Sequence, residues 1–119
     1  MQSETRARVD QLTTPAGDPV AVLRFEGDIA STSRNAVLGT YQALGKDAAK
    51  LILLDFTKVE YINSSGIALV IQLLMEAANA GQKVAAFGLS AHFTKVFTMV
   101  GIPKYASLFS AQPEALAAL

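Results

Sequence analysis

The sequence contains no cysteine and no tryptophan, and its only histidine is His92. The absence of thiols excludes disulfides and cysteine-ligated metal centres. One histidine is too few for a multi-histidine metal site or for a hydrolase with several candidate bases. Ten basic and ten acidic side chains give a formal net charge of zero, which argues against nonspecific binding to nucleic acid. We therefore expect no metal, no cofactor and no nucleic-acid partner.

Long hydrophobic runs are also missing. The first ten residues include Glu4, Arg6, Arg8 and Asp10, so the apolar region of a signal peptide is not recognisable there. No run reaches the roughly 18 apolar residues of a membrane-spanning helix. These features predict a cytoplasmic protein without membrane insertion. The 119 residues, 51% of them hydrophobic, suffice for one domain over residues 1–119.

Hydrophobic periodicity predicts strands and helices in alternation after an initial hairpin. The expected strands are residues 3–13, 19–26, 51–54, 83–87 and 105–109, with Asp55 ending the third strand. Four helices are expected. The first follows the candidate caps Ser31, Thr32 and Ser33, the second covers residues 64–80, the third follows the cap Ser90, and the fourth covers residues 113–119. The order β-β-α-β-α-β-α-β-α implies a mixed sheet with right-handed crossovers.

The second predicted helix has an unusually wide apolar arc. A helical wheel places five residues within about 100° of one another as its core side: Ile67, Val70, Ile71, Leu74 and Ala78. Leu69 lies beside this arc. Leu69, Gln72 and Met75 are therefore candidates for a partner-facing side. The alternative is that they are covered by a neighbouring loop or in a homodimer.

The segment Asn63-Ser64-Ser65-Gly66 opens this helix. Asparagine is a strong N-cap, and the first turn of a helix has unpaired N–H groups at the positive end of its dipole. A phosphate on a serine there would add about −1.5 to −2 charge within reach of those N–H groups. Gly66 allows another backbone to approach closely. On these grounds alone, an ordinary helix cap is the commoner interpretation.

Several separated motifs resemble the STAS domain family (sulphate transporter and anti-sigma factor antagonist). In chain order they are Gly27-Asp28-Ile29, Asp55-Phe56-Thr57, the segment 59–67 with its Asn-Ser-Ser-Gly, Gly88-Leu89-Ser90 and Val100-Gly101-Ile102. The resemblance runs from about Val20 to Leu116, and the compact length is similar to that of bacterial anti-anti-sigma factors. The implied fold is an α/β STAS-like mixed sheet with helices packed mainly on one face.

The resemblance also implies a function, which is that of an anti-sigma factor antagonist without catalytic activity. Such proteins bind an anti-sigma factor that is also a serine kinase, and this binding releases a sigma factor. The kinase then phosphorylates the first serine of the motif, here Ser64, and a PP2C-type phosphatase reverses the modification. Ser65 is the alternative acceptor. The expected partner-binding residues are Asp28, Asn63, Ser64, Ser65, Gly66, Leu69 and Gln72.

One position departs from the family pattern, because the usual motif begins with aspartate where this chain has Asn63. Asparagine caps a helix about as well as aspartate but carries no charge. The departure gives weight to an alternative without a phosphorylation switch. In that alternative the chain is a scaffold subunit of a stressosome-like signalling complex, or a small subunit of a lipid or ion transporter. An enzyme is the third hypothesis, and it is disfavoured because Ser64 has no evident general base.

Overall fold

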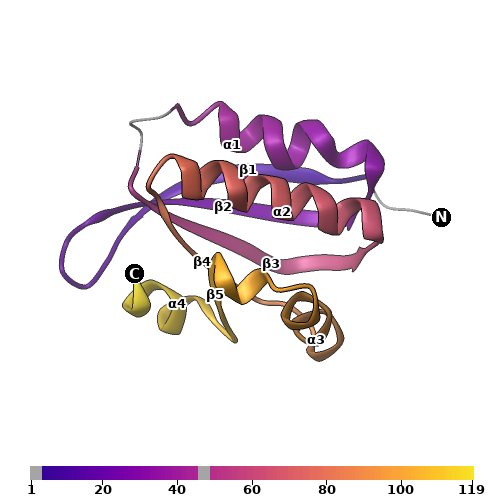
Figure 1. Ribbon diagram of the computed structural model, residues 1–119. Helices are drawn as coiled ribbons and strands as arrows, with labels where there is room; N and C mark the ends of the chain where they lie inside the picture. The colour runs from indigo at the N-terminus through magenta and orange to yellow at the C-terminus, as the bar shows by residue number, and fades with distance from the viewer. Residues whose placement is uncertain (1–3, 46–48) are drawn as a thin grey trace.

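The computed structural model describes residues 4–45 and 49–119. Its single sheet has five strands in the order β1-β2-β3-β4-β5 (Figure 1). β1 (Arg6–Thr13) pairs antiparallel with β2 (Pro19–Ile29), whereas β3 (Leu51–Ile62), β4 (Lys83–Phe87) and β5 (Ala106–Phe109) are each parallel to the preceding strand. The predicted mixed sheet and element order are confirmed. Ser3, where the first strand was expected to begin, lies outside the described residues.

The helices follow the predicted order. The first is a composite of a 3₁₀ turn (Ser31–Ser33), a π turn (Asn35–Gly39) and α1 (Thr40–Gln42). It is followed by α2 (Ser64–Asn79), α3 (Ala91–Met99), a 3₁₀ turn (Ile102–Lys104) and α4 (Gln112–Ala118). None of the helices in the described part of the chain is both long and apolar enough to cross a bilayer.

The start of the first helix differs from the prediction. The N-cap is Ala30, so the three predicted caps Ser31, Thr32 and Ser33 all lie inside the first turn. The buried hydroxyl of Ser33 accepts a hydrogen bond from the backbone N–H of Ala30 at 2.9 Å. α1 ends at Gln42 with Ala43 as its C-cap, and Gly45 just beyond has the left-handed φ of +81° that glycine adopts at low cost.

The second and third strands extend further than predicted. β2 continues through Gly27 to Ile29 across two register irregularities, and β3 continues past Asp55 to Ile62. Beyond Asp55, β3 has no β4 residue beside it, and its buried residues Phe56 and Ile62 are separated by four exposed residues and the partly buried Val59. Prediction of the third strand from a continuous apolar run therefore recovered only its first part, where β4 flanks it.

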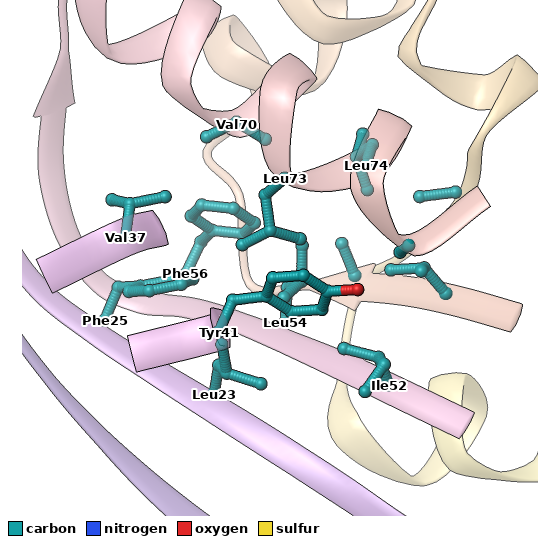
Figure 2. Close-up of a cluster of buried hydrophobic side chains, with 14 of the residues drawn as sticks. Leu23, Phe25, Val37, Tyr41, Ile52, Leu54, Phe56, Val70, Leu73 and Leu74 are labelled. Carbon is teal, nitrogen blue, oxygen red and sulfur yellow. The ribbon is translucent and has the colours of Figure 1, made fainter. Parts of the chain in front are cut away.

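The apolar core lies mainly on one face of the sheet. Residues of β2 and β3 meet the first helix and α2 there, as Figure 2 shows for Leu23, Phe25, Tyr41, Phe56 and Leu73 among others. The rings of Phe56 and Phe97 meet edge to face with centroids 5.6 Å apart, which adds α3 to the same face. α4 covers a smaller apolar cluster on the opposite face, formed by Val20, Val22, Leu53, Ala85, Phe87 and Ala115. The predicted packing of helices mainly on one face is confirmed.

Candidate functional site

The start of α2 is held by backbone and side-chain hydrogen bonds. After β3 ends, the backbone N–H of Asn63 donates to the carbonyl of Ile29 at 3.1 Å. Asn63 Oδ1 accepts from the N–H of Gly66 at 2.8 Å, and the extended backbone of Asn63 completes an N-cap. Asn63 therefore both ends β3 and caps α2, as its place in the sequence predicts.

Gly66 explains why the helix can lie so close to the end of β2. A Cβ atom at this position would lie 2.2 Å from the carbonyl oxygen of Ile29. No side chain fits there without backbone movement, so the predicted close approach of another backbone at Gly66 is confirmed. The first turn of α2 is fixed against β2 by this contact together with the Asn63 hydrogen bonds.

Ser64 and Ser65 are exposed at this fixed helix start. Ser64 begins a line of residues at helical spacing that continues through Ala68, Ile71 and Met75. Ala68 is exposed, Ile71 is partly exposed and Met75 retains 49% of its surface. We call this line, together with the partly exposed Ile67 and the exposed Ala78, the outer strip of α2. It is apolar throughout apart from Ser64 itself.

The buried side of α2 differs from the predicted one. Its buried residues are Gly66, Leu69, Val70, Leu73, Leu74 and Ala77. Leu69 is only 7% exposed and belongs to the core, so its assignment as a partner-facing residue is wrong. The predicted core residue Ala78 is exposed. The wide apolar arc did not reveal which part the first helix would cover, and that helix packs against the Leu69 side.

Gln72 and Glu76 lie along the boundary between α2 and the first helix. Gln72 is partly exposed, and its Oε1 lies 3.5 Å from Arg34 Nη1. Glu76 accepts a hydrogen bond from the Gln42 side chain at 3.1 Å. Gln72 therefore borders the outer strip, as a candidate binding residue should, while part of its side chain is occupied within the chain.

Asp28 lies at the same end of the sheet as Ser64. In the register between β2 and β3, Asp28 is opposite Tyr61, and the next pair leads directly into Asn63. Asp28 is half-buried, and its backbone carbonyl accepts hydrogen bonds from the hydroxyls of Thr5 and Ser33. The expectation that Asp28 and Ser64 share one rim of the sheet agrees with this geometry.

Tyr61 was not identified from the sequence as a site residue. It is 53% exposed, and its ring meets that of Phe93 edge to face with centroids 6.0 Å apart. His92, exposed in the first turn of α3, contacts the same Phe93 ring. The alternation of exposed Tyr61 with buried Ile62 was the available signal, and it was missed because this stretch was interpreted as a connector instead of a strand.

A second polar cluster lies on the opposite face of the sheet. Arg24 Nε lies 2.5 Å from Asp10 Oδ2, and its Nη1 contacts Asp55 Oδ2 at 2.8 Å and Gln112 Oε1 at 3.0 Å. The Arg24 hydrogen bond holds the pKa of Asp10 below its usual value. Asp55 also accepts the backbone N–H of Thr57 at 2.8 Å. Arg24, Asp55 and Gln112 line an open hollow of about 500 Å³.

No group of three or more metal-ligating side chains occurs within residues 4–45 and 49–119. Ser64 begins a helix whose neighbouring cap is an amide, and His92 is on a different helix. A hydroxyl exposed at a fixed helix start, next to an apolar strip, is instead suited to modification and to contact with another protein.

Comparison with known families identifies the class of protein. The family model described as "Mlab, STAS domain" matches residues 12–109. The chain therefore belongs to the STAS domain family. No curated protein matches the chain.

Solved structures of STAS proteins share the fold at low sequence identity. An anti-sigma factor antagonist from Mycobacterium paratuberculosis is 16% identical with a TM-score of 0.79, covering 97% of this chain and 93% of that one. A sulfate transporter family protein from Wolinella succinogenes is 16% identical with a TM-score of 0.73, covering 83% of each chain. The anti-sigma factor antagonist SpoIIAA in its unphosphorylated form is 18% identical with a TM-score of 0.67, covering 91% of each chain.

Proposed function

We propose that this chain is an anti-sigma factor antagonist whose partner docks at the start of α2 and is released when Ser64 is phosphorylated. The observation that carries the proposal is an exposed serine on a rigidly held helix start, at the head of an apolar strip. A structural neighbour, SpoIIAA, is an anti-sigma factor antagonist with structures in unphosphorylated and phosphorylated forms. Its fold similarity supports the proposal at the level of class.

The proposed partner surface combines the rim with the outer strip of α2. It keeps Asp28, Asn63, Ser64, Ser65 and Gln72 from the sequence prediction, whereas the predicted Gly66 is buried against Ile29 and is not part of it. Ala68, Ile71 and Met75 take the place of the buried Leu69. Apolar side chains exposed in one line supply the area that a protein partner covers, and the polar rim supplies specificity.

Phosphorylation would act on this surface through charge. A phosphate adds about −1.5 to −2 charge to a chain whose formal net charge is zero. At an apolar interface this charge must be desolvated when the partner binds, which opposes binding. Because the capping residue Asn63 is uncharged, the phosphate would introduce negative charge at a cap that has none before modification. The proposed partner is an anti-sigma factor serine kinase, with a PP2C-type phosphatase restoring the unmodified serine.

The test searches the genes next to that of this chain for a kinase-fold anti-sigma factor and measures its binding to the purified chain. Ser64→Asp is expected to weaken binding by about 100-fold, a coupling of about 3 kcal/mol. Ser64→Ala should bind as the unaltered chain does. Ser107→Asp, at an exposed position on β5, is the matched control for added charge and should also bind normally. Absence of binding, or equal affinities for Ser64→Asp and Ser107→Asp, would refute the proposal.

A second candidate is a subunit that binds a transporter component without a phosphorylation switch. It is favoured by the family description "Mlab, STAS domain", by the similar sulfate transporter family structure, and by Asn63 in place of the usual aspartate. This candidate predicts a stable complex with a transporter ATPase, and phosphosite mass spectrometry should find Ser64 unmodified in cells. Kinase-dependent phosphate at Ser64 would exclude it.

A further inference from the structure

The outer edge of β1 is an unusually open edge of the sheet. β1 lies at the end of the strand order and pairs with β2 on one side only (Figure 1). Its eight residues contain no proline or glycine, and its register with β2 is regular from Arg6 opposite Glu26 to Thr13 opposite Pro19. Natural edge strands are usually short, bulged or interrupted by proline, which discourages pairing with another chain. β1 has none of these features, and only its charged side chains discourage such pairing.

Those charges form a pattern along β1. Arg6, Arg8, Asp10 and Leu12 alternate with Ala7, Val9 and Gln11, so the two sets point to opposite faces of the sheet. Leu12 packs against the apolar cluster under α4, and Ala7 packs against the main core. The charged set therefore lies on the α4 side, while Val9 lies on the same side as the first helix.

Two copies of β1 can pair in very few registers. Residues directly opposite each other in an antiparallel pair share a face of the sheet. A two-fold axis between two copies of β1 must therefore be level with one residue, which then lies opposite its own copy, and not midway between consecutive residues. An axis at Arg8 would place two arginines opposite each other, and an axis at Asp10 would place two aspartates opposite each other. An axis at Ala7 would place Arg6 opposite Arg8. Like charges directly opposite destabilise a strand pair.

An axis at Val9 reverses this balance. Arg8 of each copy then lies opposite Asp10 of the other, which gives two ion pairs related by the axis, and Val9 lies opposite Val9. The side chains are accessible for this contact: Arg8 is 67% and Asp10 40% exposed, and Val9 retains 37% of its surface. Arg24 holds the Asp10 carboxylate in place at 2.5 Å. An axis at Gln11 leaves both charges opposite uncharged residues and aligns fewer residues of β1.

We propose that the edge of β1 binds a second copy of this chain, antiparallel and centred on Val9, so that the two sheets become continuous. The charge pattern of β1 selects this occupant and this register. The surface is separate from the start of α2, so the inference does not depend on the role of Ser64.

Cross-linking tests the register directly, because the chain has no cysteine of its own. Opposite residues of an antiparallel pair have Cα atoms about 4.5–5.5 Å apart, within the range of a disulfide. Val9→Cys should therefore form a covalent dimer under mild oxidation. Ser107→Cys, exposed on the strand at the other edge of the sheet, is the matched control and should stay monomeric. Equal cross-linking of the two variants would overturn the proposal.

Sedimentation of the full chain from about 1 µM to about 1 mM measures the affinity itself. We expect a monomer–dimer equilibrium that Val9→Lys weakens at least tenfold and Ser107→Lys leaves unchanged. Arg8→Asp and Asp10→Arg should each dimerise poorly alone, and a mixture of the two should form a heterodimer because all four charges are then complementary. A chain that stays monomeric throughout, or a dimer insensitive to Val9→Lys, would refute the inference. Circular dichroism melting of each variant identifies any that fails to fold.

Discussion

The two faces of the sheet are stabilised in different ways. On one face, the first helix, α2 and α3 cover a continuous apolar core that includes Phe25, Phe56 and Phe97. On the other face, α4 covers a smaller cluster, and the strands beyond it expose ion pairs centred on Arg24. The first face depends on burial, whereas the second combines limited burial with charge pairing in contact with water.

One face of the sheet therefore contributes mainly to stability, whereas the other leaves more of its side chains accessible. The covered face includes Gly66, and its packing presents the exposed Ser64 at the rim. The less covered face leaves charged side chains of β1 accessible at the sheet edge. The chain thus combines a closely packed helix start with a more polar, accessible strand edge.

The largest effect should come from removing an aromatic ring on the covered face. Phe97→Ala deletes a fully buried ring that contacts Phe56, and it should lower the free energy of unfolding by about 4 kcal/mol because a cavity remains. Phe109→Ala on the other face, where the ring is only partly buried, should cost clearly less. Urea denaturation measures both values. Equal losses would show that the two faces contribute alike.

A smaller but still large effect is expected at Gly66. Gly66→Ala places a methyl group against the carbonyl of Ile29 and should lower the free energy of unfolding by about 3 kcal/mol, because backbone must move. Gly39→Ala is the matched control: its methyl group meets only Asn35 Cβ at 3.8 Å, so it should be neutral or stabilise by about 0.5–1 kcal/mol. If both variants were equally stable, the proposed close seating of α2 on β2 would be wrong.

The smallest effect should be the pH dependence of the open face. The pKa of Asp10 is lowered in the folded chain, chiefly by its hydrogen bond from Arg24. Its stabilising contribution is therefore present above its unfolded pKa of about 3.9 and is lost as the pH falls through the lower folded value. Asp10→Asn should be less stable than the unaltered chain at pH 6, and the difference should shrink as the pH falls below about 3.9. Thermal unfolding at several pH values tests this, and a difference independent of pH would contradict it.

Much of the fold was predictable because local patterns and the tertiary structure agree. Continuous apolar runs located β4 and the first part of β3, and Ser90 was correctly predicted to cap α3, where it accepts the N–H of Phe93 at 3.2 Å. Asn63 and Gly66 were interpreted correctly because capping and close backbone approach depend on the residue itself. Such short-range requirements can be recognised in a sequence.

Longer-range features were not predictable in the same way. The extension of β3 to Ile62 depends on pairing with β2, which lies more than thirty residues earlier in the chain. Leu69 is buried and Ala78 exposed because the first helix packs on one side of α2. The Arg24 cluster joins Asp10, Asp55 and Gln112 from three separate elements. None of these contacts leaves a periodic signal in the local sequence.

Local patterns in the sequence specify the order of strands and helices, the cap and close approach at the start of α2, and the motifs of the STAS family. These follow from backbone geometry and hydrophobic period, which act over a few residues. Two other features depend on the assembled fold: the part of the wide apolar arc of α2 that stays exposed, and the open edge of β1 with Arg8 and Asp10 accessible. Burial is a property of neighbours brought together by the fold, and a residue's own pattern does not specify them.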